Sequence, residues 1–395
     1  MKIQGRLLFH LALALCVAVL AGLSAAAQAE DDHQRIPKRI VADYTSGSKF
    51  LNPPYDVAQI PFHKLTHIIH AGVPWNSDGS LYIENGFVEP DLVRKAHEHG
   101  VKVMLLSGGD FGVIEASPQV FDTVLANLKQ FVTENDYDGI DIDWEFPSNA
   151  TDRAFFVTLM RRLRETFPSP RYTLSADLAP WNGDFYDTRK LKDYASFFNL
   201  MVYDCAGPWT SSGHLNSPIF WDNRDPQPEE CEPGASDQQA AELFLKTVPA
   251  KQINIGTPFY GYYYTNVTGL FGFCPNAPTT PDGFCDDTVL TMNYGPNIKQ
   301  LINKQGWRRE YDPFALVPYL VRADGSPGFI TYDDAFSTYA RVHYADWDLG
   351  LGGAFMWSLD ADYDGHSQDL LDAMYRATVE GRHRHQDSTR PSFKP

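Results

Sequence analysis

The stretch Asp138–Glu145 reads DGIDIDWE and, from Asp141 onward, carries an acidic side chain at every second position of an otherwise apolar run. Side chains alternate between the two faces of a β-strand, so a strand here places Asp141, Asp143 and Glu145 on one face. The two isoleucines and the tryptophan then share the opposite face. The pattern predicts a strand that packs through its apolar face and presents its acidic face to a site.

The three acidic side chains lie too close together to ionise independently. Their successive α-carbons are about 7 Å apart at ~3.3 Å rise per residue, so at least one carboxyl is expected to hold a proton near neutral pH. A carboxylic acid in that state is a candidate general acid. Two other interpretations are a solvated acidic edge, which the flanking isoleucines and tryptophan disfavour, and a cation site, since carboxylates suit magnesium or calcium.

Short aliphatic and β-branched runs recur on both sides of this stretch, with helical patterns between them. One helical stripe, Phe156 to Phe167, has the spacing i, i+3, i+4, i+7 and i+11. Strands that alternate with helices indicate a parallel sheet, and eight units over about 330 residues predict an α/β fold, a (β/α)8 TIM barrel. The expected strands are Arg39–Tyr44, His67–Ala71, Lys102–Ser107, Gly139–Glu145, Tyr172–Asp177, Leu200–Asp204, Asn254–Pro258 and Ala354–Ser358.

A doubly wound open sheet is the alternative fold. No Gly-x-Gly-x-x-Gly follows the first expected strand, which disfavours its nucleotide-binding form. In the barrel, Glu145 falls at the carboxyl end of the fourth strand, where such barrels carry their chemistry. The last two strands are separated by about 95 residues, too many for an ordinary connection. We therefore expect an inserted subdomain at about 262–340, within a catalytic domain of residues 30–380.

Both ends of the chain are expected to lie outside the barrel. Residues 1–29 have a basic start, an apolar stretch from about Leu7 to Leu23 and an Ala-x-Ala end at Ala29, the pattern of a cleaved secretory signal peptide. A membrane anchor is the alternative, but the apolar stretch is somewhat short for it. We expect an extracellular or periplasmic protein with no membrane span, and a flexible tail over 381–395.

Cysteine content and charge limit the possible partners. Four cysteines remain after residue 29, and an even number in an exported chain predicts disulfides. Three pairings are possible; nearest-neighbour pairing would close two loops rich in proline and glycine, and zinc is the weaker alternative. The 33 basic and 50 acidic residues give a charge of −17, which argues against nucleic acid as a partner. The candidate disulfide residues are Cys205, Cys231, Cys274 and Cys285.

The acidic stretch resembles the Asp-x-x-Asp-x-Asp-x-Glu signature of glycoside hydrolase family 18, the chitinases. Further segments resemble motifs of the same family in the expected order, over roughly Arg39 to Tyr375. The resemblance implies the (β/α)8 barrel, with a small α+β insertion between strands 7 and 8. The further segments are Met201–Asp204, Gly256–Gly261, Ile330–Asp334 and Gly352–Asp362.

The resemblance also implies roles for individual residues. Glu145 would be the general acid/base, and Asp143 would orient the substrate's N-acetyl group. Asp141 would share a proton with Asp143, and Tyr203 would donate a hydrogen bond to the acetyl carbonyl. Trp357 would form the floor beneath the sugar ring, since aromatic rings suit a sugar's C–H face. The other expected residues are Asp204, Met201, Trp209 and Tyr44 for substrate binding, and Asp138 and Gly139 for structure.

Several positions depart from the family pattern. Ser107 is displaced by one from the family's Ser-x-Gly-Gly, a change that affects its supporting hydrogen bond to the acidic strand. Phe355 stands where the family usually has Met, and Tyr262 where it often has Arg; these changes bear on specificity more than on activity. His70 is expected to be a wall residue. Three more tryptophans are candidates either for a stacking track or for packing: Trp75, Trp181 and Trp221.

The resemblance implies a secreted, retaining hydrolase of chitin or chitooligosaccharides that uses substrate-assisted catalysis. We expect a monomer that needs no cofactor and no metal. The alternatives are a non-catalytic chitin-binding lectin on the same fold, or a hydrolase of N-glycans or peptidoglycan. Lectins of this family commonly lack the last acid of the signature, whereas this chain has Glu145.

Overall fold

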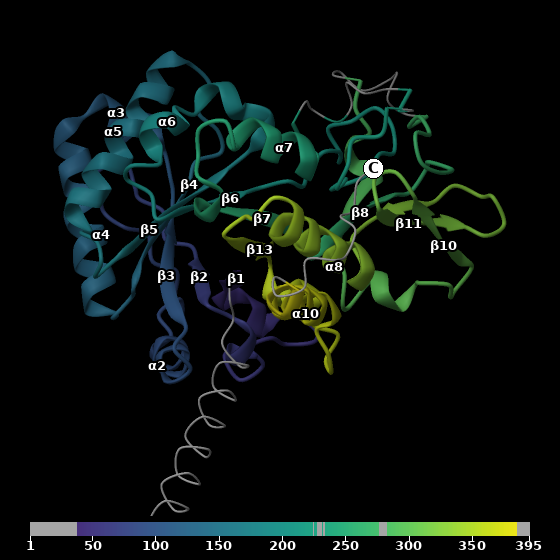
Figure 1. The fold of residues 1–395 in the computed structure, drawn as a ribbon, viewed down its shortest axis with the longest axis horizontal. Helices are drawn as coiled ribbons and strands as arrows, with labels where there is room; N and C mark the ends of the chain where they lie inside the picture. Colours follow the sequence, from purple (N-terminus) through teal and green to yellow (C-terminus); the bar gives the residue numbers. More distant parts are fainter. Residues whose placement is uncertain (1–37, 224, 227–230, 232–233, 276–282, 385–395) are drawn as a thin grey trace, which may run out of the picture. The chain divides into compact units, whose positions relative to one another are not determined.

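Eight parallel strands close into a barrel in the computed structural model of the chain, which describes residues 38–223, 225–226, 231, 234–275 and 283–384 (Figure 1). Each strand pairs with the next one along the chain, and the last pairs with both the seventh and the first. The predicted (β/α)8 barrel is confirmed. Its strands are β1 (Arg39–Thr45), β2 (His67–Ala71), β3 (Lys102–Ser107), β4 (Gly139–Asp143), β5 (Thr173–Leu178), β6 (Phe197–Leu200), β7 (Ile253–Pro258) and β13 (Gly353–Trp357).

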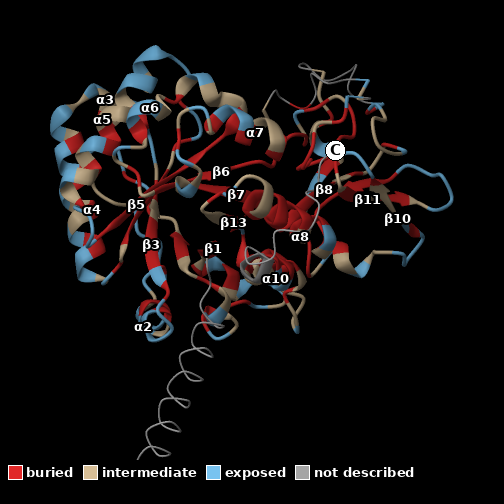
Figure 2. Ribbon diagram, viewed as in Figure 1, coloured by how far each residue is buried: buried red, intermediate tan, exposed pale blue. Residues whose placement is uncertain are grey.

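Helices cover the outer face of the barrel. The expected stripe on α5 is buried, and Asn149 caps that helix by accepting from two backbone N–H groups. The strands are largely buried, whereas α4 and α5 expose one face (Figure 2). The helices are α2 (Pro90–Glu98), α3 (Phe111–Ala116), α4 (Pro118–Glu134), α5 (Ala150–Thr166), α6 (Thr188–Leu191), α7 (Asp237–Phe244), α8 (Ala335–His343), α9 (Leu359–Asp362) and α10 (Asp369–Arg384).

The sixth strand lies earlier in the chain than expected. It covers Phe197–Leu200, whereas the sequence pattern predicted Leu200–Asp204. The chain leaves the ladder after Leu200, because the N–H of Val202 turns back to the carbonyl of that residue, and Asp204 takes a φ of 61°. The apolar residues after Leu200 that suggested a strand therefore belong to the loop that follows β6.

A five-stranded antiparallel sheet is inserted after β7. Its strand order is β10-β11-β12-β8-β9, and β8 begins two residues after β7 ends. The following helix, α8, packs against α10, so the chain has returned to the barrel's outer layer there. The strands are β8 (Tyr260–Tyr264), β9 (Val289–Asn293), β10 (Trp307–Asp312), β11 (Val317–Arg322) and β12 (Phe329–Thr331).

Helix α10 continues to Arg384, so the limit expected at 380 falls inside a helix. The signal peptide expected at 1–29 and residues 385–395 of the expected tail lie outside the described residues. Within the described residues, no helix combines the length and apolar character that crossing a membrane requires. Two disulfides join Cys205 to Cys231 and Cys274 to Cys285, which is the nearest-neighbour pairing.

A buried arginine ties the β6–β7 connection to the end of the inserted sheet. Arg341 of α8 is fully buried and donates to Asp237 at 2.5 Å, to Asp333 at 3.2 Å and to the carbonyl of Ser217 at 2.7 Å. A guanidinium suits this place because it supplies several donors in a fixed plane. The two carboxylates are stable in the core because this cation lies between them.

Replacing Arg341 by methionine should lower the free energy of unfolding by about 3–5 kcal/mol, because two buried carboxylates lose their cation. Urea denaturation measures the change. The control is Arg376→Met, which removes an arginine that is 60% exposed and 3.9 Å from Glu380; its effect should stay below about 1 kcal/mol. Equal losses in the two variants would contradict a structural role for the Arg341 cluster.

Candidate active site

The acidic face of β4 points into the barrel lumen. Asp141 is fully buried, Asp143 is partly buried, and Glu145 lies exposed at the mouth. The apolar face points to the helices, where Trp144 stacks on Phe111 with ring centroids 4.3 Å apart. The strand ends at Asp143, two residues earlier than predicted, but the expected alternation of faces continues through Trp144 and Glu145.

The two residues that open the acidic stretch fix β4 in the sheet. Asp138 accepts from the N–H of Val103 at 2.9 Å and pairs with His97 at 2.8 Å. At Gly139 an added Cβ would fall on the carbonyl of Thr173, so only glycine allows this approach of β4 to β5. Both residues are placed as structural supports.

Asp141 takes its hydrogen bonds from β5. The hydroxyl of Ser175 donates to Oδ1 of Asp141; Oδ2 has no donor of this kind and lies close enough to the carboxyl of Asp177 to share a proton with it. Ser107 of β3 does not take part, because its hydroxyl donates to the carbonyl of Val73 at 2.7 Å. Leu106 packs into the lumen instead. The supporting hydroxyl therefore comes from a different strand than the family pattern suggested.

Two further carboxyls in the lumen were missed by sequence reasoning. Asp43 of β1 is fully buried, and Asp177 of β5 is 4% exposed. Neither oxygen of Asp43 has a hydrogen-bond partner among the described residues. The sequence could have indicated both residues as candidates, because each is the single acidic residue near the carboxyl end of an expected barrel strand. In the described part of the chain, no three His, Cys, Asp or Glu side chains are grouped to hold a metal ion.

Burial and mutual repulsion raise the pKa values of the carboxyls on β4. Burial, with the nearby charges of Glu145 and Asp141, raises the pKa of Asp143 to about 8. Burial raises the pKa of Asp141 to about 6, against the lowering effect of its hydrogen bonds from Ser175 and Asp177. The pKa of Glu145 is also raised, first by partial desolvation of its carboxyl at the mouth and then by the charge of Asp204. The higher pKa makes Asp143, rather than Asp141, the carboxyl of this pair that favours the protonated form near neutral pH.

Asp204 is held by two tyrosines of the inserted sheet. The hydroxyls of Tyr260 and Tyr262 donate to its Oδ1 at 2.5 and 2.8 Å. Its backbone N–H donates to Asn216 at 2.9 Å, which supports the positive φ. Burial raises the pKa of Asp204 above its ordinary value, although the hydrogen bonds from the two tyrosines act in the opposite direction. A neutral hydroxyl from Tyr262 thus contacts Asp204, at the position where the family often has arginine.

The remaining expected lumen residues lie around these carboxyls. Met201 and Tyr203 are buried in one apolar cluster with Phe355. The ring of Tyr203 is 6.0 Å from that of Phe355 and 6.1 Å from that of Tyr260. Burial, and then the neighbouring lumen carboxyls, raises the pKa of the Tyr203 hydroxyl. This hydroxyl is therefore a neutral donor.

The tryptophans divide between exposed and packed positions. Trp357, at the end of β13, is 38% exposed and Trp209 is 42% exposed, so both have surface available for a ligand. Trp75 is buried edge-on against Phe111 and serves packing. The other two are partly buried: Trp181 contacts Phe146 edge-on, and Trp221 packs beside the Cys205–Cys231 disulfide.

Tyr44 does not reach the lumen, which corrects its assignment to substrate binding. Alternation along β1 places Asp43 inside the barrel and Tyr44 on the opposite face. Tyr44 is fully buried, its hydroxyl donates to Glu89 at 3.2 Å, and its ring contacts Tyr55. His70 lies in the same layer with hydroxyls at both ring nitrogens, Ser46 and Tyr137 at 2.7 Å each, so it is a wall residue as predicted.

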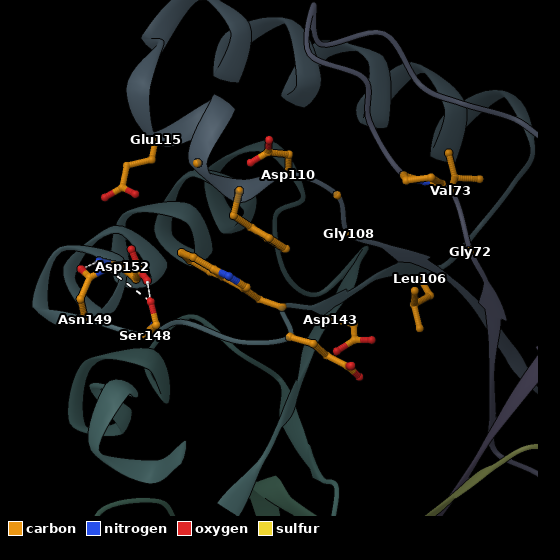
Figure 3. Close-up of a pocket in the computed structure, with 16 residues that line it drawn as sticks. Gly72, Val73, Leu106, Gly108, Asp110, Glu115, Asp143, Ser148, Asn149 and Asp152 are labelled. Atoms are coloured by element: carbon orange, nitrogen blue, oxygen red, sulfur yellow. Dashed lines mark hydrogen bonds between the residues drawn. The ribbon is translucent and has the colours of Figure 1, made fainter. Parts of the chain in front are cut away.

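A pocket of about 700 Å³ opens beside Asp143 and Glu145 (Figure 3). Its wall is formed at and after the carboxyl ends of β2, β3 and β4, by residues 72–74, 106, 108–112, 143–145, and 148, 149 and 152. Gly108 allows the wall to close, since an added Cβ would lie 2.7 Å from the carbonyl oxygen of Asp143. Asp110, Glu115 and Asp152 also line this pocket.

The glycosyl hydrolases family 18 model matches residues 40–362, and the chain belongs to this family. The probable chitinase 2 of Drosophila melanogaster is 26% identical over 73% of this chain and 62% of its own length. The probable endochitinase of Caenorhabditis elegans is 31% identical over 75% of this chain and 51% of its own length. The chain therefore spans between half and two thirds of the length of these two relatives.

The barrel also matches solved structures. The group IV chitinase of Ostrinia furnacalis, solved in complex with allosamidin, superposes with a TM-score of 0.75. The match covers 87% of this chain and 99% of that one, at 21% sequence identity. At this identity the match shows a shared fold.

The raised pKa of Asp143 predicts a pH dependence of stability. Between its ordinary pKa of 3.8 and its folded value of about 8, the folded protein holds a proton that the unfolded chain releases. The contribution to stability is therefore present at low pH and lost as pH rises through this window. When the pH is raised from about 4.5 to about 8.5, Asp143→Asn should lose less free energy of unfolding than the wild type. The difference is about 1.4 kcal/mol for each pH unit that separates the folded and unfolded pKa values of Asp143.

Urea denaturation at the two pH values measures this difference. The control is Asp122→Asn, which removes an exposed carboxyl of α4 and should keep the wild-type dependence. If the free energy of unfolding of Asp143→Asn fell with pH as steeply as that of the wild type, Asp143 would be ionised throughout this range.

Proposed function

We propose that the protein is a secreted chitinase that hydrolyses β-1,4-linked N-acetylglucosamine polymers with retention of anomeric configuration. The observation that carries this proposal is the pair at the lumen mouth, where an exposed Glu145 lies beside a partly buried Asp143 whose pKa is raised. The first residue can exchange protons with a bound substrate, and the second can donate to it. The family membership and the names of the relatives support a chitin substrate.

Glu145 would act first as general acid and then as general base. It would protonate the leaving glycosidic oxygen while the substrate's acetyl carbonyl oxygen attacks the anomeric carbon. The resulting oxazolinium carries positive charge, which the carboxyls of Asp143 and Asp141 would stabilise. Glu145 would then take a proton from the water that opens this intermediate. This family is an exception to the scheme in which a protein carboxylate is the nucleophile.

The other lumen residues would hold the sugar in the reactive position. Tyr203 would donate to the acetyl carbonyl, and Asp204 would accept from the substrate while its two tyrosine bonds fix its direction. Trp357 would stack beneath the ring at the cleavage point. Trp209 would extend the contact along the chain of sugars.

The alternative of a non-catalytic lectin would use the same pocket. The presence of Glu145 at the mouth favours the enzyme. Secretion is supported by the pattern of residues 1–29 and by the two disulfides, which persist in oxidising compartments. We propose that the enzyme acts as a monomer on chitin or its oligosaccharides.

Glu145→Gln should keep its fold and its affinity for an N-acetylglucosamine hexamer but lose ~10²–10⁴-fold in hydrolysis rate, the usual effect of removing a general acid. Chromatography of the products measures hydrolysis, and tryptophan fluorescence measures binding. The control is Glu165→Gln, on the exposed face of α5, which should keep the wild-type rate. Hydrolysis by Glu145→Gln within a factor of a few of wild type would place the acid elsewhere.

The substrate-assisted route predicts a strict need for the acetyl group. The enzyme should cleave chitin oligomers, fail on cellulose oligomers of the same length, and reject a deacetylated unit at the cleavage point. The first product detected by NMR should be the β-anomer. An α-anomer formed first would indicate inversion, and efficient cleavage at a glucosamine unit would refute the acetyl nucleophile.

A further inference from the structure

Beneath Glu145, four carboxyls from three strands share the barrel lumen. Asp43, Asp141 and Asp177 are at most 4% exposed, and Asp143 lies above them. The carboxyls of Asp141 and Asp177 lie close enough for a hydrogen bond, and Oδ2 of Asp141 has no other donor among the described residues. Such a bond forms only if one of the two carboxyls carries a proton. The remaining contacts of each carboxyl determine which one carries it.

A chain of hydrogen bonds from the barrel floor fixes the role of one Asp177 oxygen. Arg39 donates through Nε to Oδ1 of Asn254 at 2.9 Å and through Nη2 to the carbonyl of Lys251 at 2.7 Å. Nδ2 of Asn254 donates to Oδ1 of Asn199 at 2.8 Å. Nδ2 of Asn199 donates in turn to Oδ1 of Asp177 at 2.8 Å.

The direction of this chain follows from its first member. A guanidinium can only donate, so the atom of Asn254 that faces Arg39 must be the amide oxygen. This orientation leaves the NH2 of Asn254 for Asn199, and the same reasoning directs the NH2 of Asn199 to Asp177. Oδ1 of Asp177 is therefore an acceptor, and Oδ2 is left as the oxygen that can carry a proton.

The partners of Asp141 complete the assignment. Its Oδ1 accepts from the Ser175 hydroxyl, a contact that favours the ionised carboxylate. The titratable groups that face Asp177 are the carboxyls of Asp43, Asp141 and Asp143 and the hydroxyl of Tyr203. Three neighbouring carboxyls disfavour a charge on Asp177, so the proton lies on Asp177 and the charge on Asp141.

We propose that Asp177 is a positioning residue that keeps a proton throughout turnover and donates it in a hydrogen bond to Asp141. Asp141 then stays the carboxylate that accepts from Asp143, while Asp143 turns between Asp141 and the substrate. This inference rests on the proposed function. Burial, and then the charges of Asp141 and Asp143, raises the pKa of Asp177 well above its ordinary value, whereas the pKa of Asp141 reaches only about 6.

The test compares Asp177→Asn with Asp177→Leu. An asparagine can accept from Asn199 and donate to Asp141, so it should reproduce a permanently protonated Asp177 and keep kcat within a factor of a few. A leucine of similar volume supplies no donor and should lower kcat on the order of 10²-fold with little change in KM, because Asp143 loses its fixed partner.

The pH profile separates this role from a merely structural one. Losing a donor to its charged form raises the pKa of Asp141, so the acid limb of kcat should move to higher pH in Asp177→Leu and stay in place in Asp177→Asn. Asp362→Asn is the matched control, because it removes another fully buried carboxyl. Asp362 accepts hydrogen bonds from the N–H groups of Leu370 and Leu371, and its replacement should leave the pH profile of kcat unchanged.

Two results would overturn the proposal: an Asp177→Asn variant as impaired as Asp177→Leu, or an Asp177→Leu variant with wild-type kcat and pH profile. If Asp177→Leu does not fold, Asn199→Ala releases Asp177 from its anchor and should move the acid limb in the same direction. An unmoved acid limb in this variant would also overturn the proposal.

A wild-type protein that does not cleave the hexamer would refute the proposed function and leave the proton assignment testable. Infrared difference spectra between wild type and Asp177→Asn at neutral pH should contain the carbonyl stretch of a protonated carboxylic acid from Asp177. A carboxylate band in its place would overturn the assignment.

Discussion

Repulsion among buried carboxyls is the constraint on which this site depends. Burial makes each negative charge costly, and every neighbouring carboxylate adds to that cost. The lumen contains Asp43, Asp141, Asp143 and Asp177, so the protons must be distributed among them. The serine, the asparagines and the tyrosines that surround these acids are the groups that decide this distribution.

The inserted sheet contributes directly to the site. Its first strand supplies Tyr260 and Tyr262, whose hydroxyls fix Asp204 at the carboxyl end of β6. The Arg341 cluster ties the end of the same sheet to the β6–β7 connection. The tyrosines can position Asp204 because the sheet that carries them is attached to the barrel at both ends.

The barrel and its acidic strand were predictable because both follow from local patterns. Period-two alternation placed the acids of β4 on one face, and the stripe on α5 has the spacing of a helix. The sixth strand was misplaced because periodicity does not distinguish Leu200 in the ladder from the apolar residues that turn away after it. Tyr44 was assigned to the wrong face, although the same alternation, counted from Asp43, places it outside.

The partners of Asp141 could not be predicted in the same way. Ser175 and Asp177 lie more than 30 residues away in the chain, and their contacts exist only because β5 pairs with β4 in one register. A register fixes which side chains meet across a barrel, and it depends on the packing of all eight strands. Sequence patterns therefore locate acids near a site more readily than they identify which of them interact.

The placement of Arg39 at the amino-terminal end of β1 has a consequence for engineering. In (β/α)8 barrels the two ends are commonly treated as separable, with stability at the floor and chemistry at the mouth. In this chain, hydrogen bonds cross that division through Asn254 and Asn199. Under the proposed function, substitutions chosen to make the floor more heat-resistant would therefore be screened for turnover as well as for melting temperature, because a floor residue also orients an amide beneath the lumen carboxyls.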